Sequence, residues 1–156
     1  MSPSAAAWSY GLFVKIRRAT EADASLMRSL WNEFNEEVPY TPYPGAPFEE
    51  SLLTDFVALV AEDEGGPLGC VYANTRQDKF GFVFGLYVRP ACRRQGIART
   101  LMRSIAEALD QEGKDYVVLS VDTPNVAARS LYERLGFVDA GRTLRTEVAA
   151  LVGTDL

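Results

Sequence analysis

Hydrophobic positions recur along the chain with two periods, and the change of period separates predicted strands from predicted helices. The segment Phe80–Val88 is an apolar run rich in Phe and Val, which is typical of a buried strand. From Ile97 to Leu109, apolar side chains recur every four residues, with arginine and acidic side chains between them. This spacing predicts an amphipathic helix that packs on a sheet. Residues 116–121 are apolar again and predict a second buried strand.

The remaining segments predict further strands with helices between them. Strands are expected at 13–17, 56–61, 68–74, 142–146 and 148–152. Helices are expected from a capping segment at 20–23 to about residue 34, at 49–54, and after Asn125. Four prolines between residues 36 and 47 exclude a helix or an inner strand, so this segment is expected to be a loop. Residues 1–11 are expected to be a loose tail, and residues 12–156 a single domain.

The turn between the strand Phe80–Val88 and the helix at Ile97 has the composition of an anion site. It contains Arg93, Arg94 and Gly96 directly before the helix begins. A glycine there permits a close backbone approach, and the first N–H groups of a helix have no partner within the helix. Together with two guanidinium groups they suit a pyrophosphate. The alternative is a solvated loop before an ordinary helix, but the strand–loop–helix context favours the phosphate site.

The segment after the second buried strand carries another candidate pair. Asn125 is a preferred residue for a helix N-cap, and Gly136 has the place of a left-handed residue that ends a helix. Asn125 and Tyr132 are seven residues apart, so they lie on one face of the helix, about 10 Å apart along its axis. That spacing suits an extended thioester arm. The alternatives are that Asn125 only caps the helix and that Tyr132 is a core aromatic residue.

These two blocks resemble the GNAT superfamily of N-acetyltransferases. The family's coenzyme pattern is Arg or Gln, any two residues, Gly, any residue, then Gly or Ala, and it matches Arg93, Gly96 and Ala98. The second block matches as Asn125 and as Leu-Tyr132-Glu-Arg-Leu-Gly-Phe. The resemblance implies an α/β chain with a central, mostly antiparallel mixed sheet flanked by helices. Its element order covers nearly the whole chain, and its specific part is 86–137.

The resemblance also implies roles for individual residues. Tyr132 would donate a proton to the departing thiolate, and Asn125 would help to hold the pantetheine arm. The sequence contains no His that could donate this proton instead. The residues expected to contact acetyl-CoA, with coenzyme A as the product, are Leu86, Tyr87, Val88, Arg93, Arg94, Gln95, Gly96, Ile97, Ala98, Arg99, Asn125 and Tyr132.

The sequence identifies the acceptor site less clearly, because two positions where members of this family carry an acidic base hold other residues here. The strand before the coenzyme loop has 82–85 as Phe-Val-Phe-Gly, and Ser120 stands five residues before Asn125. Deprotonation of the amine through bound water is one interpretation. The candidate acceptor residues are Glu36, Glu37, Tyr40, Tyr43 and Asp122. Each acid has the alternative of a solvated or bracing charge, and each tyrosine that of ordinary surface packing.

Composition narrows the class of protein. A length of 156 residues suits one domain, and 47% hydrophobic residues indicate a globular chain. A net charge of −5 argues against nucleic acid as a partner, because phosphates require a basic face. No apolar run of about 18 residues would cross a membrane, and the first ten residues lack a secretory signal. With two lone cysteines, Cys70 and Cys92, we expect reduced thiols, a cytoplasmic protein and no metal.

Two hypotheses follow from the sequence. The first is an acyltransferase that moves acetyl from acetyl-CoA to a primary amine, by direct attack in a ternary complex. The acceptor would be a small-molecule amine or a peptide N-terminus, and the protein a monomer or homodimer. The second is an acyl-CoA-binding sensor with little or no catalysis, which the missing acidic residues allow. Tyr132 favours the enzyme, because a binding module has no thiolate to protonate.

Overall fold

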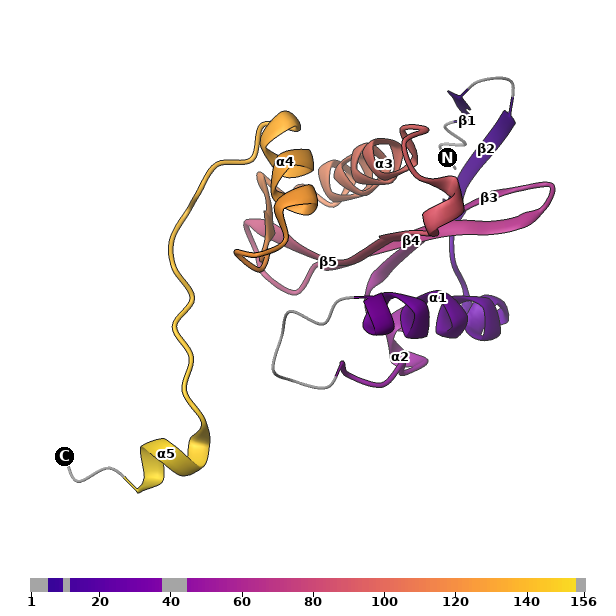
Figure 1. Ribbon diagram of the computed structural model, residues 1–156. Coiled ribbons are helices and arrows are strands. Elements are labelled where there is room, and N and C mark those ends of the chain that lie inside the picture. The colour runs from indigo at the N-terminus through magenta and orange to yellow at the C-terminus, as the bar shows by residue number, and fades with distance from the viewer. Residues whose placement is uncertain (1–5, 10–11, 38–44, 154–156) are drawn as a thin grey trace.

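The computed structural model describes residues 6–9, 12–37 and 45–153 (Figure 1). Six strands form one sheet in the order β1-β2-β3-β4-β5-β6. They are β1 (Ala6–Ser9), β2 (Leu12–Arg18), β3 (Val57–Asp63), β4 (Gly66–Asn74), β5 (Phe80–Val88) and β6 (Tyr116–Leu119). Neighbours from β1 to β5 are antiparallel, and β6 is parallel to β5. The predicted mixed, mostly antiparallel sheet is therefore confirmed.

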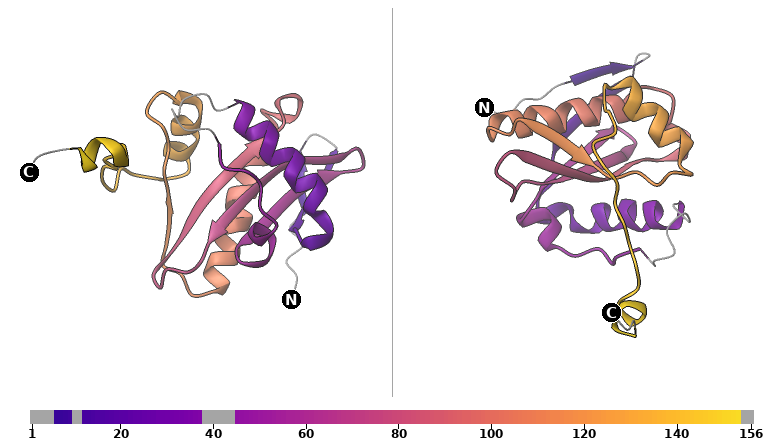
Figure 2. Two further views of the ribbon diagram at one scale, coloured as in Figure 1. Left: turned by 90° about the horizontal axis from the view of Figure 1, so that it is seen from below. Right: turned by 90° about the vertical axis from the view of Figure 1, so that its left-hand side faces the viewer.

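Helices cover the sheet on both faces (Figure 2). On one face lie the 3-10 turn η1 (Glu21–Asp23), α1 (Ala24–Glu37) and α2 (Ser51–Thr54). On the other lies α3 (Ile97–Gln111), which follows the 3-10 turn η2 (Pro90–Cys92), with α4 (Val126–Arg134) beside it. A short helix, α5 (Val148–Val152), comes near the C-terminus. Each expected helix up to α4 is present, although α1 continues to Glu37 instead of ending near residue 34.

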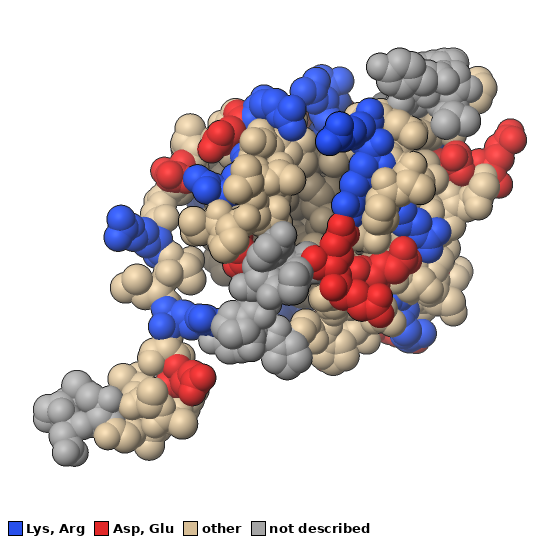
Figure 3. All heavy atoms as spheres, viewed as in Figure 1, with Lys and Arg blue, Asp and Glu red and all other residues tan. Residues whose placement is uncertain are grey.

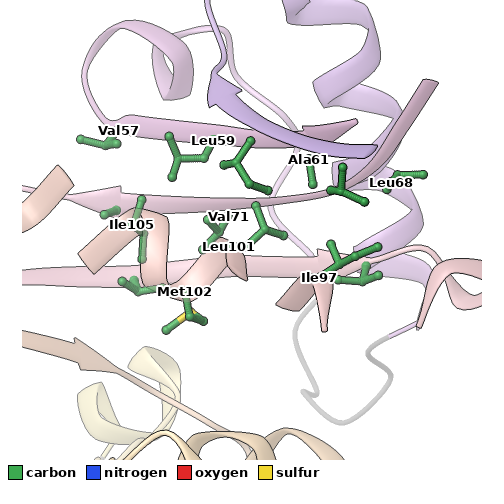
Figure 4. Packing of buried hydrophobic residues seen from close by; sticks show 14 of the residues in the cluster. Val57, Leu59, Ala61, Leu68, Val71, Ile97, Leu101, Met102 and Ile105 are labelled. Atoms are coloured by element: carbon green, nitrogen blue, oxygen red, sulfur yellow. The ribbon is translucent and has the colours of Figure 1, made fainter. Parts of the chain in front are cut away.

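The core beneath α3 is aliphatic (Figure 4). Leu101 and Ile105 of α3 are fully buried against strand residues such as Val71. These helix residues are the members of the four-residue repeat that predicted the amphipathic helix. The repeat therefore places one face of α3 on the sheet and fixes how the loop before Ile97 meets the end of β5.

The core beneath α1 and α2 is aromatic. Trp31 packs edge-on against Tyr72 and Phe84, and the rings of Tyr72 and Phe84 are stacked with centroids 5.4 Å apart. Between the pairs Tyr72–Phe84 and Cys70–Tyr87, β5 has two residues where β4 has one, which is a β-bulge. Gly85 lies in the bulge with φ +65, and a Cβ there would lie 2.8 Å from the ring of Tyr72. Glycine is required at this point.

The start of α1 confirms the predicted capping segment. The backbone N–H of Thr20 donates to the Asp23 carboxylate, at 2.8 Å, in a capping box. The same carboxylate accepts two hydrogen bonds from the guanidinium of Arg17, at 2.8 and 2.9 Å. Arg17 holds the pKa of Asp23 at about 2, below its ordinary value of 3.8. This pair fixes the first turn of α1 to β2.

Two predictions about the ends of the chain are wrong. Within the expected loose tail, residues 6–9 form β1, because they pair in register with β2. Residues 142–146 form no strand, and the expected strand at 148–152 is the helix α5. Residues 138–153 are exposed and extend away from the sheet (Figure 1), so no neighbouring strand is there to pair with them. Val148, Leu151 and Val152 recur at helical spacing instead.

No helix within the described ranges has the length and apolar character needed to cross a membrane.

Candidate active site

The loop from β5 to α3 has the backbone of an anion site. Arg94, with φ 63, is the only described residue other than glycine with a positive φ, and Gly96 follows with φ 80. In the described part of the chain, no carbonyl accepts a hydrogen bond from the N–H groups of residues 94–98. These donors meet at the N-terminal end of α3, where the helix dipole is positive. The arrangement can bind a phosphate group.

The charged side chains near this loop form two groups. Arg94 and Arg99 are exposed and make no ion pair with any described residue. Figure 3 shows a hollow on this face of the molecule, with Lys and Arg side chains along its upper border and Asp and Glu side chains gathered below it. Basic groups next to the free N–H donors add to the attraction for an anion.

Arg93 has other contacts. Its Nε donates to the Val88 carbonyl at 2.9 Å, its guanidinium lies 5.8 Å from the centroid of the Tyr87 ring, and its Nη2 donates to the Glu37 carboxylate. The hydrogen bond from Arg93 to Glu37 raises the pKa of Arg93, so the guanidinium stays charged. That Arg93 binds phosphate stays a prediction, and Glu37, a candidate acceptor residue, is here an ion-pair partner.

A second pair, Arg89 with Glu33, was not predicted. The Arg89 guanidinium donates to both carboxylate oxygens of Glu33, at 3.0 to 3.3 Å, and to the carbonyl of Pro67 at 3.0 Å. A signal was present in the sequence. Glu33 and Glu37 are four residues apart on a helix, and Arg89 and Arg93 are four apart on the loop that faces it.

The other residues that we predicted to contact the coenzyme lie at the end of β5, in the loop and at the start of α3. Tyr87 and Val88 are buried on opposite faces of the sheet, and Ile97 is buried under α3. Leu86 and Ala98 are half-buried and pack against the aliphatic core. Gln95 is half-buried between Arg94 and Gly96. The loop therefore joins two buried anchors, while its own polar groups face outward. Contact of these residues with coenzyme stays a prediction.

Helix α4 has the expected beginning and end. The Oδ1 of Asn125 accepts a hydrogen bond from the N–H of Ala128, at 3.2 Å, which confirms the N-cap. At the other end the N–H of Phe137 donates to the Tyr132 carbonyl at 3.0 Å, and Gly136 has φ 93. This pattern is a Schellman motif, in which the residue after the left-handed glycine packs on the last turn. The rings of Tyr132 and Phe137 have centroids 5.6 Å apart, a contact that commonly accompanies this motif.

Tyr132 is held between α4 and the sheet. Its side chain is half-buried and packs against the aliphatic core. Burial raises the pKa of the Tyr132 hydroxyl above its ordinary value of 10. The hydroxyl is therefore protonated at neutral pH and can act as a proton donor.

The candidate acceptor residues do not form one cluster in the described structure. Glu36 is exposed, whereas Glu37 is bound to Arg93. Asp122 is half-buried in the turn before α4, where its carbonyl accepts from the N–H of Asn125 at 2.9 Å. Tyr40 and Tyr43 lie outside the described residues. No acidic side chain is therefore identified as the base.

The end of this acceptor segment is attached to α1. The indole N–H of Trp31 donates to the Ala46 carbonyl at 2.7 Å, and the side-chain amide of Asn35 donates to the same oxygen at 2.9 Å. Beneath them, the Tyr72 hydroxyl is buried and has no hydrogen-bond partner among the described residues. Sequence reasoning did not single out Tyr72, because an unpaired hydroxyl leaves no pattern in a strand.

Two further observations concern Cys70 and possible metal ligands among the described side chains. Burial raises the pKa of the Cys70 thiol to about 12, so it is a poor nucleophile at neutral pH. In the ranges that the structure describes, no three His, Cys, Asp or Glu side chains group in a way that would hold a metal ion.

Comparison with known proteins agrees with this arrangement. Human N-acetyltransferase 8 is 30% identical over 146 residues, which cover 82% of this chain and 62% of that protein. N-alpha-acetyltransferase 30 of Xenopus laevis is 31% identical over 124 residues, which cover 78% of this chain and 45% of that protein. The chain thus spans less than two thirds of the length of either relative.

A similar solved structure and a family model complete the comparison. An aminoglycoside N-acetyltransferase in complex with CoA has the same fold, with a TM-score of 0.75 at 18% identity, over 90% of this chain and 98% of that one. Residues 24–137 match the model of the acetyltransferase (GNAT) family, and this range includes α1, the loop before α3 and all of α4. The chain therefore belongs to the GNAT family of acetyltransferases.

Proposed function

We propose that this protein is an N-acetyltransferase that moves acetyl from acetyl-CoA to a primary amine. The observation that carries the proposal is the loop before α3. It presents free N–H donors, Arg94 and Gly96 in left-handed conformation, and exposed arginines at a helix N-terminus. Membership of the family and a protonated Tyr132 on α4, which packs on the same aliphatic core as α3, support it further.

The residues present fit acetyl-CoA at both ends of the site. Backbone N–H groups of residues 94–98 would hold the pyrophosphate, and Arg94 and Arg99 would add charge around it. At Gly96, no described residue beyond its chain neighbours and the helix backbone has an atom within 4 Å of the position that a Cβ would occupy, so the approach to the loop is open. Asn125 is half-buried at the start of α4, the helix that carries Tyr132, and we expect the pantetheine arm to run between these two residues.

The proposed chemistry is a single transfer. Bound acetyl-CoA supplies the acetyl thioester. The amine nitrogen forms a bond to the acetyl carbon, the carbon–sulfur bond breaks, and the hydroxyl of Tyr132 gives its proton to the sulfur. The surplus proton of the amine leaves to water, and solvent returns a proton to Tyr132. Because burial raises the pKa of Tyr132, it regains that proton readily at neutral pH.

Bound water is the base that we propose for the amine. Glu37 is neutralised by Arg93, and Glu36 is exposed on the last turn of α1. An ammonium group with a pKa near 10 must lose a proton before it attacks, and a water chain or the small neutral fraction can meet that need. Activity should therefore rise with pH as the free amine fraction grows, up to the pH at which Tyr132 ionises.

For the acceptor, we propose a small-molecule amine or a peptide N-terminus bound near residues 36–43. Support comes from the names of the relatives, one an N-alpha-acetyltransferase and one an aminoglycoside N-acetyltransferase. The hydrogen bonds from Trp31 and Asn35 to Ala46 hold the chain after this segment against α1. Tyr40 and Tyr43 are the side chains that we expect to form its aromatic wall.

The test is a panel of amines incubated with acetyl-CoA and the protein, with thiol release and acetylated product both measured. The panel should include aminoglycosides, polyamines, amino acids and short peptides with different N-termini. The proposal expects product from at least one class, together with an equal amount of free coenzyme A. If coenzyme A binds and no amine in the panel is acetylated, the protein is better described as an acyl-CoA sensor.

A further inference from the structure

Two ion pairs join the end of α1 to the loop that precedes α3. Glu33 and Glu37, one helical turn apart, contact Arg89 and Arg93 respectively. We call these four residues the clasp. Its two arginines flank η2, the turn that begins the anion-binding loop. The clasp therefore connects the helix that leads into the acceptor segment with the loop that we propose for the coenzyme.

The arginine of each pair also holds backbone of the sheet. Arg89 donates from its side chain to the Pro67 carbonyl at 3.0 Å, and its backbone N–H donates to the Leu68 carbonyl at 2.8 Å. Arg93 donates to the Val88 carbonyl at 2.9 Å. Each guanidinium is thus fixed on one side by the sheet and on the other by a carboxylate of α1. Loss of the carboxylate would leave only the first attachment.

The residue directly after the clasp has a conformation that needs support. Arg94 has φ 63, and a left-handed backbone is unfavourable for a residue with a Cβ. Such a conformation persists where the surrounding structure holds it. Arg93, the preceding residue, has its side chain fixed at three points: Val88, Glu37 and the ring of Tyr87. The N–H groups of the anion site begin at Arg94.

We propose that Glu37, with Glu33, is a positioning residue for the coenzyme: the clasp holds the loop at 93–98 in the conformation that binds phosphate. This inference rests on the proposed function, because it assumes that the loop binds coenzyme A. The clasp and simple electrostatics predict opposite effects on coenzyme binding when Glu37 is replaced. Glu37 carries negative charge close to a site for an anion, so by charge alone its removal should strengthen binding. The clasp requires that its removal weaken binding.

Coenzyme A affinity, measured by calorimetry without an acceptor, separates these two expectations. Glu37→Gln keeps the size of the side chain and removes its charge. We expect its dissociation constant for coenzyme A to rise about two- to fivefold, in the upper part of the range for partly exposed ion pairs. The matched control is Glu36→Gln, an exposed neighbour without an ion pair to any described residue, which should change the affinity by less than about twofold.

A double variant shows whether Glu37 acts through Arg93. If it does, Glu37→Gln combined with Arg93→Gln should bind no more weakly than Arg93→Gln alone. In steady-state kinetics at saturating acceptor, the Michaelis constant for acetyl-CoA should rise by a larger factor than any change in the turnover number. Thermal unfolding of each variant, followed by circular dichroism, establishes that the fold is retained. Should Glu37→Gln disturb the fold, Glu33→Gln serves as the second variant, with the same expected direction.

The outcomes are distinct. Unchanged or tighter binding of coenzyme A by Glu37→Gln overturns the clasp and leaves the proposed function standing. Additive losses in the double variant also overturn it, because Glu37 would then act independently of Arg93. If the wild-type protein does not bind coenzyme A, both the clasp and the proposed function are wrong.

Discussion

The two faces of the sheet are covered by different types of side chain. The face under α3 is aliphatic, with side chains such as Leu101 and Ile105 that carry no polar atoms. The face under α1 and α2 is aromatic and holds polar groups: the buried hydroxyl of Tyr72, the indole N–H of Trp31 and, at its edge, the clasp. The first face thus supports the loop before α3 by packing of the residues on either side of it, Val88 and Ile97. The second depends on specific polar contacts, and it is the face from which the acceptor segment leaves.

The largest difference between the faces should appear when a buried group is removed from each. Leu101 is fully buried beneath α3, so Leu101→Ala leaves a cavity in an aliphatic core. We expect a loss of about 2–5 kcal/mol in the free energy of unfolding, measured with urea. Arg103→Ala, on the exposed side of the same helix, is the control and should cost less than about 0.5 kcal/mol. An equal cost for both would mean that α3 does not pack as described.

On the aromatic face, the start of α1 should be sensitive to acid. The pKa of Asp23 is lowered to about 2, so the folded state binds its proton less readily than the unfolded chain. Its contribution is therefore present above about pH 4 and is lost as pH falls toward 2. Asp23→Asn should lower stability at pH 7 by about 2 kcal/mol, with a much smaller loss at pH 2.

Urea unfolding of Asp23→Asn at both pH values measures this effect. Asp110→Asn, an exposed position on α3, is the control and should show little change at either pH. A loss of equal size at pH 7 and pH 2 would show that the Arg17 pair is not its source.

A pair of glycine substitutions separates the effect of backbone strain from the effect on coenzyme A binding at the loop before α3. Gly96 and Gly113 have φ 80 and 77, and at both an added Cβ would meet no described residue within 4 Å apart from the adjoining backbone. Replacement by Val should therefore strain the backbone similarly at the two ends of α3. Only Gly96→Val should raise the dissociation constant of coenzyme A, by at least tenfold, or about 1.4 kcal/mol. Equal affinities of the two variants in calorimetry would place the phosphate elsewhere.

The smallest effect is expected from a buried hydroxyl, and its sign is opposite to that of Leu101→Ala. Tyr72 is fully buried, and within residues 6–9, 12–37 and 45–153 its hydroxyl has no hydrogen-bond partner. Tyr72→Phe removes an unsatisfied polar group while keeping the stacked ring, so stability should stay the same or rise by up to about 1 kcal/mol. Urea unfolding measures it. A clear loss of stability would show that the hydroxyl has a partner in solution.

The aliphatic face was largely predictable from the sequence, and the aromatic face was not. A four-residue repeat from Ile97 to Leu109 is local, so it indicated both the helix and its buried side. Asn125 and Gly136 likewise act within a few residues of their own helix. The contacts of the clasp join residues 56 positions apart, and no local pattern reports such pairs.

The predictions for the two chain ends were wrong for a related reason. The apolar residues at 148–152 fit either a strand or a helix. A strand would form there only if a neighbouring strand were present to pair with it. The pairing of β1 with β2 depends on backbone groups, to which side-chain patterns are a poor guide. The acceptor side has the same difficulty, because its recognition depends on residues brought together by the fold.

The central claim is that Tyr132 donates the proton to the leaving thiolate, and turnover of Tyr132→Phe tests it most directly. The substitution keeps the ring that packs on Phe137 and removes the hydroxyl. With an amine from the panel, the account predicts unchanged acetyl-CoA binding and a turnover number lower by about a hundredfold or more. Tyr116→Phe, the same change at an exposed tyrosine of β6, should retain wild-type turnover. Wild-type turnover by Tyr132→Phe would contradict the account.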